Sequence, residues 1–177
     1  MPRLQPRRFL ALGSLALTAI AIAGCSPAPA PQPSPTPAFA SEAEAFAAAE
    51  ETYRAYNDAV NADRAGLQPS SPRTYLTGLA LESDYETSRL LDEDQLSIHG
   101  DGVVSSFVGQ EFDEDATPNI ATASVCMDVS RTQLLDASGD DVTPASRRDR
   151  INLDVAFVAA GGTFLIAEST ASETSAC

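Results

Sequence analysis

The first strong pattern along the chain is helical. After Ser41, apolar side chains recur at spacings of three and four, and they are Phe46, Ala49, Tyr53, Tyr56 and Val60. Ser41 and Glu44 have the spacing of a capping box, which marks the start of a helix. Gly66 can provide a left-handed cap at the other end. We therefore predict one amphipathic helix of about 22 residues that ends near residues 63–64.

Two shorter helices are expected to follow. Pro72, at a first helical position, opens one that runs towards Leu79. Ser83 and Glu86 repeat the capping-box spacing and open another. This third helix is expected to end before the acidic run at residues 92–94, because carboxylates are disfavoured at a helix C-terminus.

Beyond Gln95 the period changes to two, which predicts strands. Residues 95–99 and 103–112 flank a glycine-rich turn and predict a hairpin. Further strands are expected over residues 121–129 and 151–157. The pair Gly161–Gly162 then turns the chain into a last strand over residues 163–167. Residues 136–141 are expected to form a turn between the two central strands.

The two central strands have one apolar face each. Its residues are Val125, Met127, Val129, Ile151, Leu153, Val155 and Phe157. We expect helices to cover this face, which predicts an α+β fold with N-terminal helices packed on a curved antiparallel sheet of four to five strands. Asp128 and Asp154 then lie on the solvent side with Cys126. A register shift of one residue would instead bring both aspartates inside, the arrangement that would favour an enzyme.

The negative net charge of the chain excludes some classes of partner. The chain has 25 acidic and 11 basic residues and a formal charge of −14. Such a surface repels phosphate backbones, so we exclude nucleic acid as a partner. No glycine-rich phosphate loop follows a strand, and we expect no cofactor.

The N-terminus has the pattern of a targeting segment. Basic residues at positions 3, 7 and 8 precede an apolar run over residues 9–23, which is shorter than the roughly 20 residues that a spanning helix needs. The run closes with Ile22, Ala23, Gly24 and Cys25, an ending that resembles the bacterial lipobox. That resemblance implies a signal peptide over residues 1–24, lipidation of Cys25 and location on the outer face of the cytoplasmic membrane. An ordinary secretory peptide with an incidental cysteine is the alternative.

A proline-rich stalk is expected over residues 25–40, where proline occupies every second position from 27 to 37. Such a segment favours extended polyproline II, at about 3.1 Å per residue, and acts as a spacer. Residues 41–177 follow as a single domain.

The cysteines suggest one disulfide. Without Cys25, the chain retains Cys126 and Cys177, an even number in an exported and therefore oxidising setting. A bridge between them is the natural interpretation. A metal site is the alternative, but two cysteines and a single histidine make a poor ligand set.

A family resemblance adds to this interpretation. The order of elements, the string FAAAEETYRAYNDAVNA, the string VCMDVS and the cysteine at position 177 resemble small exported lipoproteins of high-GC Gram-positive bacteria. The domain of those proteins is similar to the cone-shaped roll of the nuclear transport factor two superfamily. The resemblance implies a long helix across a curved sheet, with a pocket between them. It carries over no catalytic position.

Few side chains suggest chemistry. His99 precedes the glycine-rich turn, where a polar residue is expected, and a pocket base is its alternative role. Tyr53 and Tyr56 lie on the apolar stripe of the first helix and are expected to be core aromatics rather than pocket acids. The acidic strings at residues 92–94, 111–115 and 136–141 lack the ligand pattern of an EF-hand, so we interpret them as solvated turns.

The resulting hypothesis is a lipid-anchored extracytoplasmic domain that binds without catalysis. Its partner would be another envelope protein or an apolar small ligand. An isomerase or cyclase that uses the same pocket is the alternative, and no catalytic, cofactor-binding or metal-binding residue is assigned.

Overall fold

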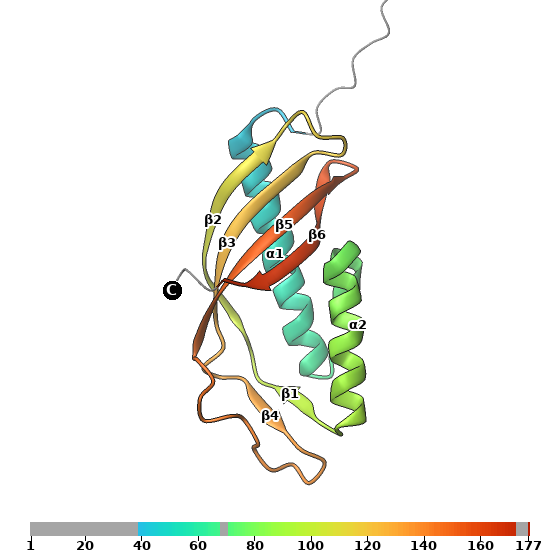
Figure 1. The fold of residues 1–177 in the computed structure, drawn as a ribbon, viewed down its shortest axis with the longest axis vertical. Coiled ribbons are helices and arrows are strands. Elements are labelled where there is room, and N and C mark those ends of the chain that lie inside the picture. The colour runs from blue at the N-terminus through green and yellow to red at the C-terminus, as the bar shows by residue number, and fades with distance from the viewer. Residues whose placement is uncertain (1–38, 68–70, 173–176) are drawn as a thin grey trace, which may run out of the picture. The chain divides into compact units, whose positions relative to one another are not determined.

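The computed structural model describes residues 39–67, 71–172 and 177 (Figure 1). Two helices pack against a curved antiparallel sheet of four strands, and a separate sheet of two strands lies beyond it (Figure 1). The fold is therefore α+β, as predicted. All described residues belong to one compact unit with a single hydrophobic core, which is the usual requirement for a part of a chain to fold alone.

The first helix, α1, spans Glu42–Arg64 and confirms the predicted caps. The Ser41 hydroxyl accepts a hydrogen bond from the backbone N–H of Glu44 at 3.2 Å, and the Glu44 carboxylate accepts one from the N–H of Ala40 at 2.8 Å. At the other end, Gly66 has φ of 70°, and its N–H donates to the Asp63 carbonyl. Each cap satisfies backbone groups that the helix leaves unpaired.

The region after α1 differs from the prediction. Pro72–Tyr75 forms a 3₁₀-helix, η1, which stops short of the expected Leu79, and α2 spans Gly78–Glu93. The predicted start of a helix at Ser83 is wrong, because Ser83 lies inside α2. The physical reason is a contact with the sheet: Leu76 bridges Ile166 in parallel, and the N–H of Thr77 donates to the Ile166 carbonyl at 2.8 Å.

The four-stranded sheet has the order β2-β3-β5-β6, and all neighbours are antiparallel. Its strands are β2 (Val103–Asp113), β3 (Ile120–Asp128), β5 (Arg150–Ala160) and β6 (Thr163–Ala171). The turn at Gly161–Gly162 joins β5 and β6, as predicted. The last strand is longer than expected, since β6 continues to Ala171 rather than ending near Ala167.

The predicted hairpin at residues 95–112 is wrong. Strand β1 (Ser97–His99) pairs with β4 (Gln133–Leu135), whereas β2 pairs with β3 (Figure 1). The backbone between β1 and β2 is held by α1 instead. The carbonyl of Gly102 accepts hydrogen bonds from the amides of Asn57 and Asn61 at 3.0 and 2.9 Å. These bonds fix the chain on the helix, so β1 and β2 do not fold back on each other.

The core lies between α1 and the inner face of the sheet. Its largest fully buried side chains are Phe157, Phe164, Ile166, Val125 and Val155. Val125 pairs with Leu153 across β3 and β5, which confirms the predicted apolar face. Asp154 is exposed on the opposite face, so the register that would bury it is wrong.

Phe39 also belongs to the core. Its ring is 5% exposed and stacks on Phe164 with centroids 4.5 Å apart. A T-shaped contact with Phe112 adds a second aromatic neighbour. Within the described residues, the packing of the domain therefore includes Phe39, which lies in the range expected for the stalk.

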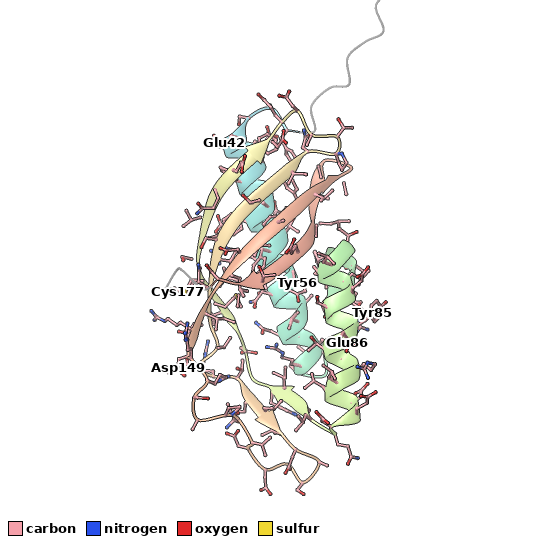
Figure 2. The ribbon with its side chains drawn as sticks, viewed as in Figure 1. Glu42, Tyr56, Tyr85, Glu86, Asp149 and Cys177 are labelled. Atoms are coloured by element: carbon pink, nitrogen blue, oxygen red, sulfur yellow. A yellow bond between two sulfur atoms is a disulfide. The ribbon has the colours of Figure 1, made fainter. Side chains whose placement is uncertain are left out.

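A disulfide joins Cys126 of β3 to Cys177 (Figure 2). Cys126 alternates with the core-facing residues Val125 and Met127, so its side chain points to the opposite side of the sheet. Its Cα lies 5.8 Å from that of Cys177. The structure thus pairs the two cysteines that the sequence suggests.

Candidate functional site

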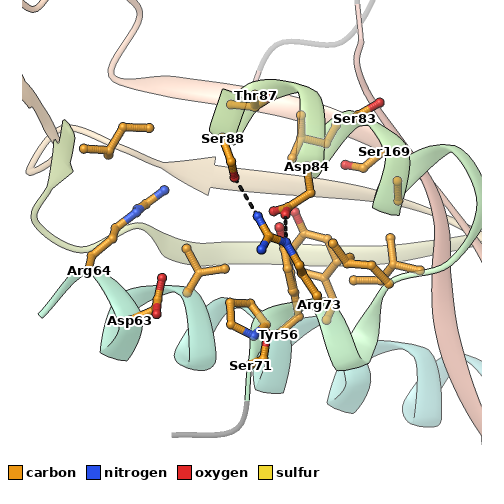
Figure 3. A pocket seen from close by; sticks show the side chains of 18 of the residues that line it. Tyr56, Asp63, Arg64, Ser71, Arg73, Ser83, Asp84, Thr87, Ser88 and Ser169 are labelled. Atoms are coloured by element: carbon orange, nitrogen blue, oxygen red, sulfur yellow. Dashed lines mark hydrogen bonds and ion pairs between the residues drawn. The ribbon is translucent and has the colours of Figure 1, made fainter. Parts of the chain in front are cut away.

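The candidate site is a cavity of about 580 Å³ bounded by α1, η1, α2 and the adjoining ends of β1, β5 and β6 (Figure 3). Cavities of roughly 300–1,000 Å³ are typical of small-molecule sites. The wall combines aliphatic side chains with hydroxyls, two arginines and two aspartates. Its apolar members are Val60, Leu76, Ala80, Leu91, Ile98, Leu153 and Ile166.

Two helix faces supply most of the wall. Tyr53, Tyr56, Val60 and Arg64 follow one another along α1 at spacings of three and four, and therefore share a face. The inner face of α2 has the same period and contributes Ala80, Ser83, Asp84, Thr87, Ser88 and Leu91. The helix α2 therefore forms one wall of the cavity, and none of its side chains is fully buried in the core.

The two tyrosines lie where the cavity meets the core. Tyr53 is 3% exposed, and its ring contacts Tyr56 edge-on at 5.9 Å. Burial raises the pKa of Tyr53, and the neighbouring Tyr56 raises it further. A hydrogen bond with Ser169 lowers it by less. Burial and the Asp84 carboxylate raise the pKa of Tyr56, whereas the positive charge of Arg64 lowers it by less. Both phenols therefore keep their protons at neutral pH and are hydrogen-bond donors. Tyr53 is a core aromatic as expected, yet both also line the cavity.

Arg73 of η1 connects to α2 across the cavity (Figure 3). Its Nε donates to the Asp84 carboxylate at 2.6 Å, and its Nη2 donates to the Ser88 hydroxyl at 2.7 Å. The guanidinium also lies over the ring of Tyr85, 4.4 Å from the centroid. The hydrogen bond to Asp84 raises the pKa of Arg73. These contacts hold α2 to η1, and the Asp84 carboxylate pairs with the positive charge of Arg73.

Arg64 lies in the last turn of α1 and is half-buried. Burial lowers the pKa of its guanidinium, and the neighbouring groups Tyr56, Asp101 and Asp63 oppose this shift. Among the residues that the structure describes, no carboxylate forms a salt bridge with it. In Figure 3, Arg64 and Asp63 lie apart from the group made by Arg73, Asp84 and Ser88.

The residues selected from the sequence are not brought together. His99 is exposed on β1, and its Nε2 lies 3.1 Å from the Ser97 hydroxyl. Asp128 accepts hydrogen bonds from Ser130, which lowers the pKa of its carboxyl. Asp154 lies on the outer face of the sheet, beside Glu168 in a shallow hollow of about 360 Å³.

The acidic strings are expected to be solvated turns, and two of them contain a capped turn. Residues 92–93 instead lie in the last turn of α2, and residues 111–113 lie in β2. The Asp113 carboxylate accepts hydrogen bonds from the backbone N–H groups of Asp115 and Ala116. Asp136 does the same for Ser138 and Asp140. Within the described ranges, no group of three or more histidine, cysteine or acidic side chains is placed to hold a metal ion.

Sequence reasoning missed Arg64, Arg73 and Asp84 as members of one site. Arg64 continues the helical spacing of Tyr53, Tyr56 and Val60, so the period of α1 could have indicated it. The roles of Arg73 and Asp84 follow from the start of α2 at Gly78, which depends on the contact of Leu76 with β6 and not on a local signal.

The wall chemistry of the described residues is suited to the binding of a small molecule. The part of the lining that the structure describes contains no histidine or cysteine, and Asp84 is engaged by Arg73. What the site offers is an aliphatic surface, neutral hydroxyls and one guanidinium without a direct partner. This arrangement can hold a small molecule with an apolar body and a polar end.

Cys25, the expected lipidation site, lies outside the described residues. No helix among residues 39–67 and 71–172 is both long and apolar enough to cross a bilayer. A scan against protein-family models, a search of curated proteins and a search of solved structures each return no match to this chain.

Proposed function

We propose that this protein is a lipid-anchored, extracytoplasmic binding protein whose domain holds a small amphipathic molecule in the cavity between α1 and α2. The observation that carries the proposal is the cavity itself, a space of about 580 Å³ with a mixed aliphatic and hydroxyl lining. Its α2 wall contains no fully buried residue. A ligand in the cavity would cover apolar surface that the protein leaves partly exposed, which is favourable by about 25 cal/mol per Å².

The location rests on the sequence. The basic and apolar N-terminal run followed by Cys25 supports export and lipid attachment. A stalk over residues 25–38 would hold the domain up to about 43 Å from the bilayer at about 3.1 Å per residue. The disulfide supports the same location, because such bridges persist in oxidising compartments. The folded part carries eight arginines against 25 acidic residues, so an anionic membrane surface would repel it and favour an extended stalk.

The resemblance to the nuclear transport factor two superfamily supports a binding role. In that superfamily a long helix and a curved sheet enclose a pocket, and many members bind without catalysis. In this protein the core fills the space between α1 and the sheet, and the cavity lies beside it, against η1 and α2.

A tryptophan reporter tests the proposal, because the chain contains no tryptophan. Leu91 lines the cavity, whereas its neighbour Leu90 points away from it and is 47% exposed. We expect Leu91→Trp in residues 35–177 to show a saturable blue shift of emission on titration with decanoate or decan-1-ol, since the ligand excludes water from the indole. Leu90→Trp is the matched control and should not respond. Equal responses from the two variants, or none from Leu91→Trp, would contradict the proposal.

A further inference from the structure

The polar end of the cavity contains one cation, Arg64, for which the described residues provide no salt-bridge partner. Four arginines lie in α1, η1 and α2. Three of them have a carboxylate within salt-bridge distance: Arg54 pairs with Glu50, Arg73 with Asp84, and Arg89 with Glu86 and Glu93. For Arg64, the fourth, the described part of the chain provides no such partner.

The position of Arg64 is well defined. The cap at Gly66 ends α1 directly after it, and the bonds from Asn57 and Asn61 to Gly102 fix the last two turns of the helix on the β1–β2 connection. The guanidinium is half-buried and faces the cavity. It therefore has less water around it than a surface arginine and can gain more from a direct ionic partner.

Two carboxylates lie near Arg64, but neither forms a salt bridge with it within the described residues. Asp63 and Asp101 are close enough to act on it electrostatically, but both are exposed. A planar guanidinium presents parallel N–H donors that match the two oxygens of a carboxylate. The unmet donors are therefore suited to an acid group entering from the cavity.

An aliphatic wall faces the same space. Leu76 is 6% exposed, Ile166 is 1% exposed, and Ile98 and Leu153 are half-buried beside them. Ile98 and Leu153 provide the accessible part of this aliphatic wall, and Leu76 and Ile166 form its buried base. An alkyl chain matches these side chains, with Tyr56 as a half-buried aromatic neighbour in the same wall.

We infer that the ligand of this cavity is a single-chain aliphatic carboxylic acid, with its carboxylate on Arg64 and its chain against Leu76, Leu153 and Ile166. The inference rests on the proposed function, whose site it specifies. The negative charge of the domain slows the approach of such a ligand but does not remove the contact, because the field of exposed charges is screened beyond about 10 Å at 0.1 M salt.

Calorimetric titration of residues 35–177 with decanoate and with decan-1-ol tests the inference. The two probes share an alkyl chain and differ in the charge of the head group. We expect decanoate to bind at least about tenfold more tightly than decan-1-ol, since a hydrogen bond to a charged group contributes on the order of a tenfold factor or more. Arg64→Gln should abolish this preference by weakening decanoate about tenfold while leaving decan-1-ol within about twofold.

Arg89→Gln is the control, because it removes the same charge from a residue outside the cavity, and it should leave the preference intact. If Arg64→Gln fails to fold, Arg64→Lys provides the second variant. It keeps the charge but loses the parallel donors, and should weaken decanoate without weakening decan-1-ol.

The outcomes separate the two proposals. Binding of neither probe would overturn the proposed function and this inference together. Equal binding of both probes, or a preference for decanoate that persists unchanged in the Arg64 variants, would overturn the carboxylate assignment alone and leave a cavity that takes neutral amphiphiles.

Discussion

Replacing Phe157 by alanine is expected to lower the free energy of unfolding by about 3–5 kcal/mol. Phe157 is fully buried, and its ring contacts Tyr53, Phe107 and Phe164 at centroid distances of 6.4, 6.0 and 6.1 Å. The substitution removes apolar surface from the core and leaves a cavity that three aromatic rings on separate elements cannot refill. Urea denaturation of residues 35–177, followed by far-ultraviolet circular dichroism, measures the change.

Val108→Ala is the matched control on the same sheet. Val108 is 54% exposed on β2, so its truncation should change stability by less than about 0.5 kcal/mol. A loss below about 1 kcal/mol for Phe157→Ala would show that α1 and the sheet do not share the core described above.

Loss of the Cys126–Cys177 disulfide is expected to lower the free energy of unfolding by about 2–4 kcal/mol. The bridge spans a sequence separation of 51 residues, for which the restriction of the unfolded chain alone accounts for about 4 kcal/mol. The reduced Cys126 thiol is buried but only weakly polar, so it adds little cost of its own. Urea denaturation with and without dithiothreitol measures the difference.

Cys177→Ser provides the control for reduction. It should match the reduced wild-type protein in stability and should not respond to dithiothreitol, since it has no bridge to lose. Identical unfolding of the oxidised and reduced wild-type protein, with both thiols shown to be free after reduction, would contradict a stabilising role for the bridge.

The parts of the fold that were predictable from the sequence depend on local signals. Helix α1 is bounded by Ser41 with Glu44 at one end and by Gly66 at the other, and each of these caps acts within one turn of the helix. The alternation in β3 and β5 is equally local, because every second side chain must enter the core.

The parts that were not predictable depend on distant partners. The expected β1–β2 hairpin had a suitable turn, but Asn57 and Asn61 bind Gly102 from α1 and redirect the chain. The start of α2 is set by the contact of Leu76 with Ile166, two residues far apart in sequence. Ser83 and Glu86 carry the spacing of a cap and still lie in the helix interior.

The candidate site combines both kinds of information. Tyr53 and Tyr56 were visible as members of one apolar stripe, although their place at the cavity was not. The pairing of Arg73 with Asp84 joins η1 to α2, and the absence of such a pair at Arg64 becomes apparent only once the described elements are assembled. A charge that lacks a partner is a property of the fold and not of a motif.

The cavity between α1 and α2 is proposed to hold the chain of an amphipathic ligand. Methyl NMR of residues 35–177 with decanoate tests this claim directly, through nuclear Overhauser contacts between ligand and protein methyl groups. We predict contacts from the alkyl chain to Leu76 and Ile166, and none to the exposed methyls of Val108 and Val142. Contacts confined to the exposed valines, or no contacts at saturating decanoate, would contradict the account.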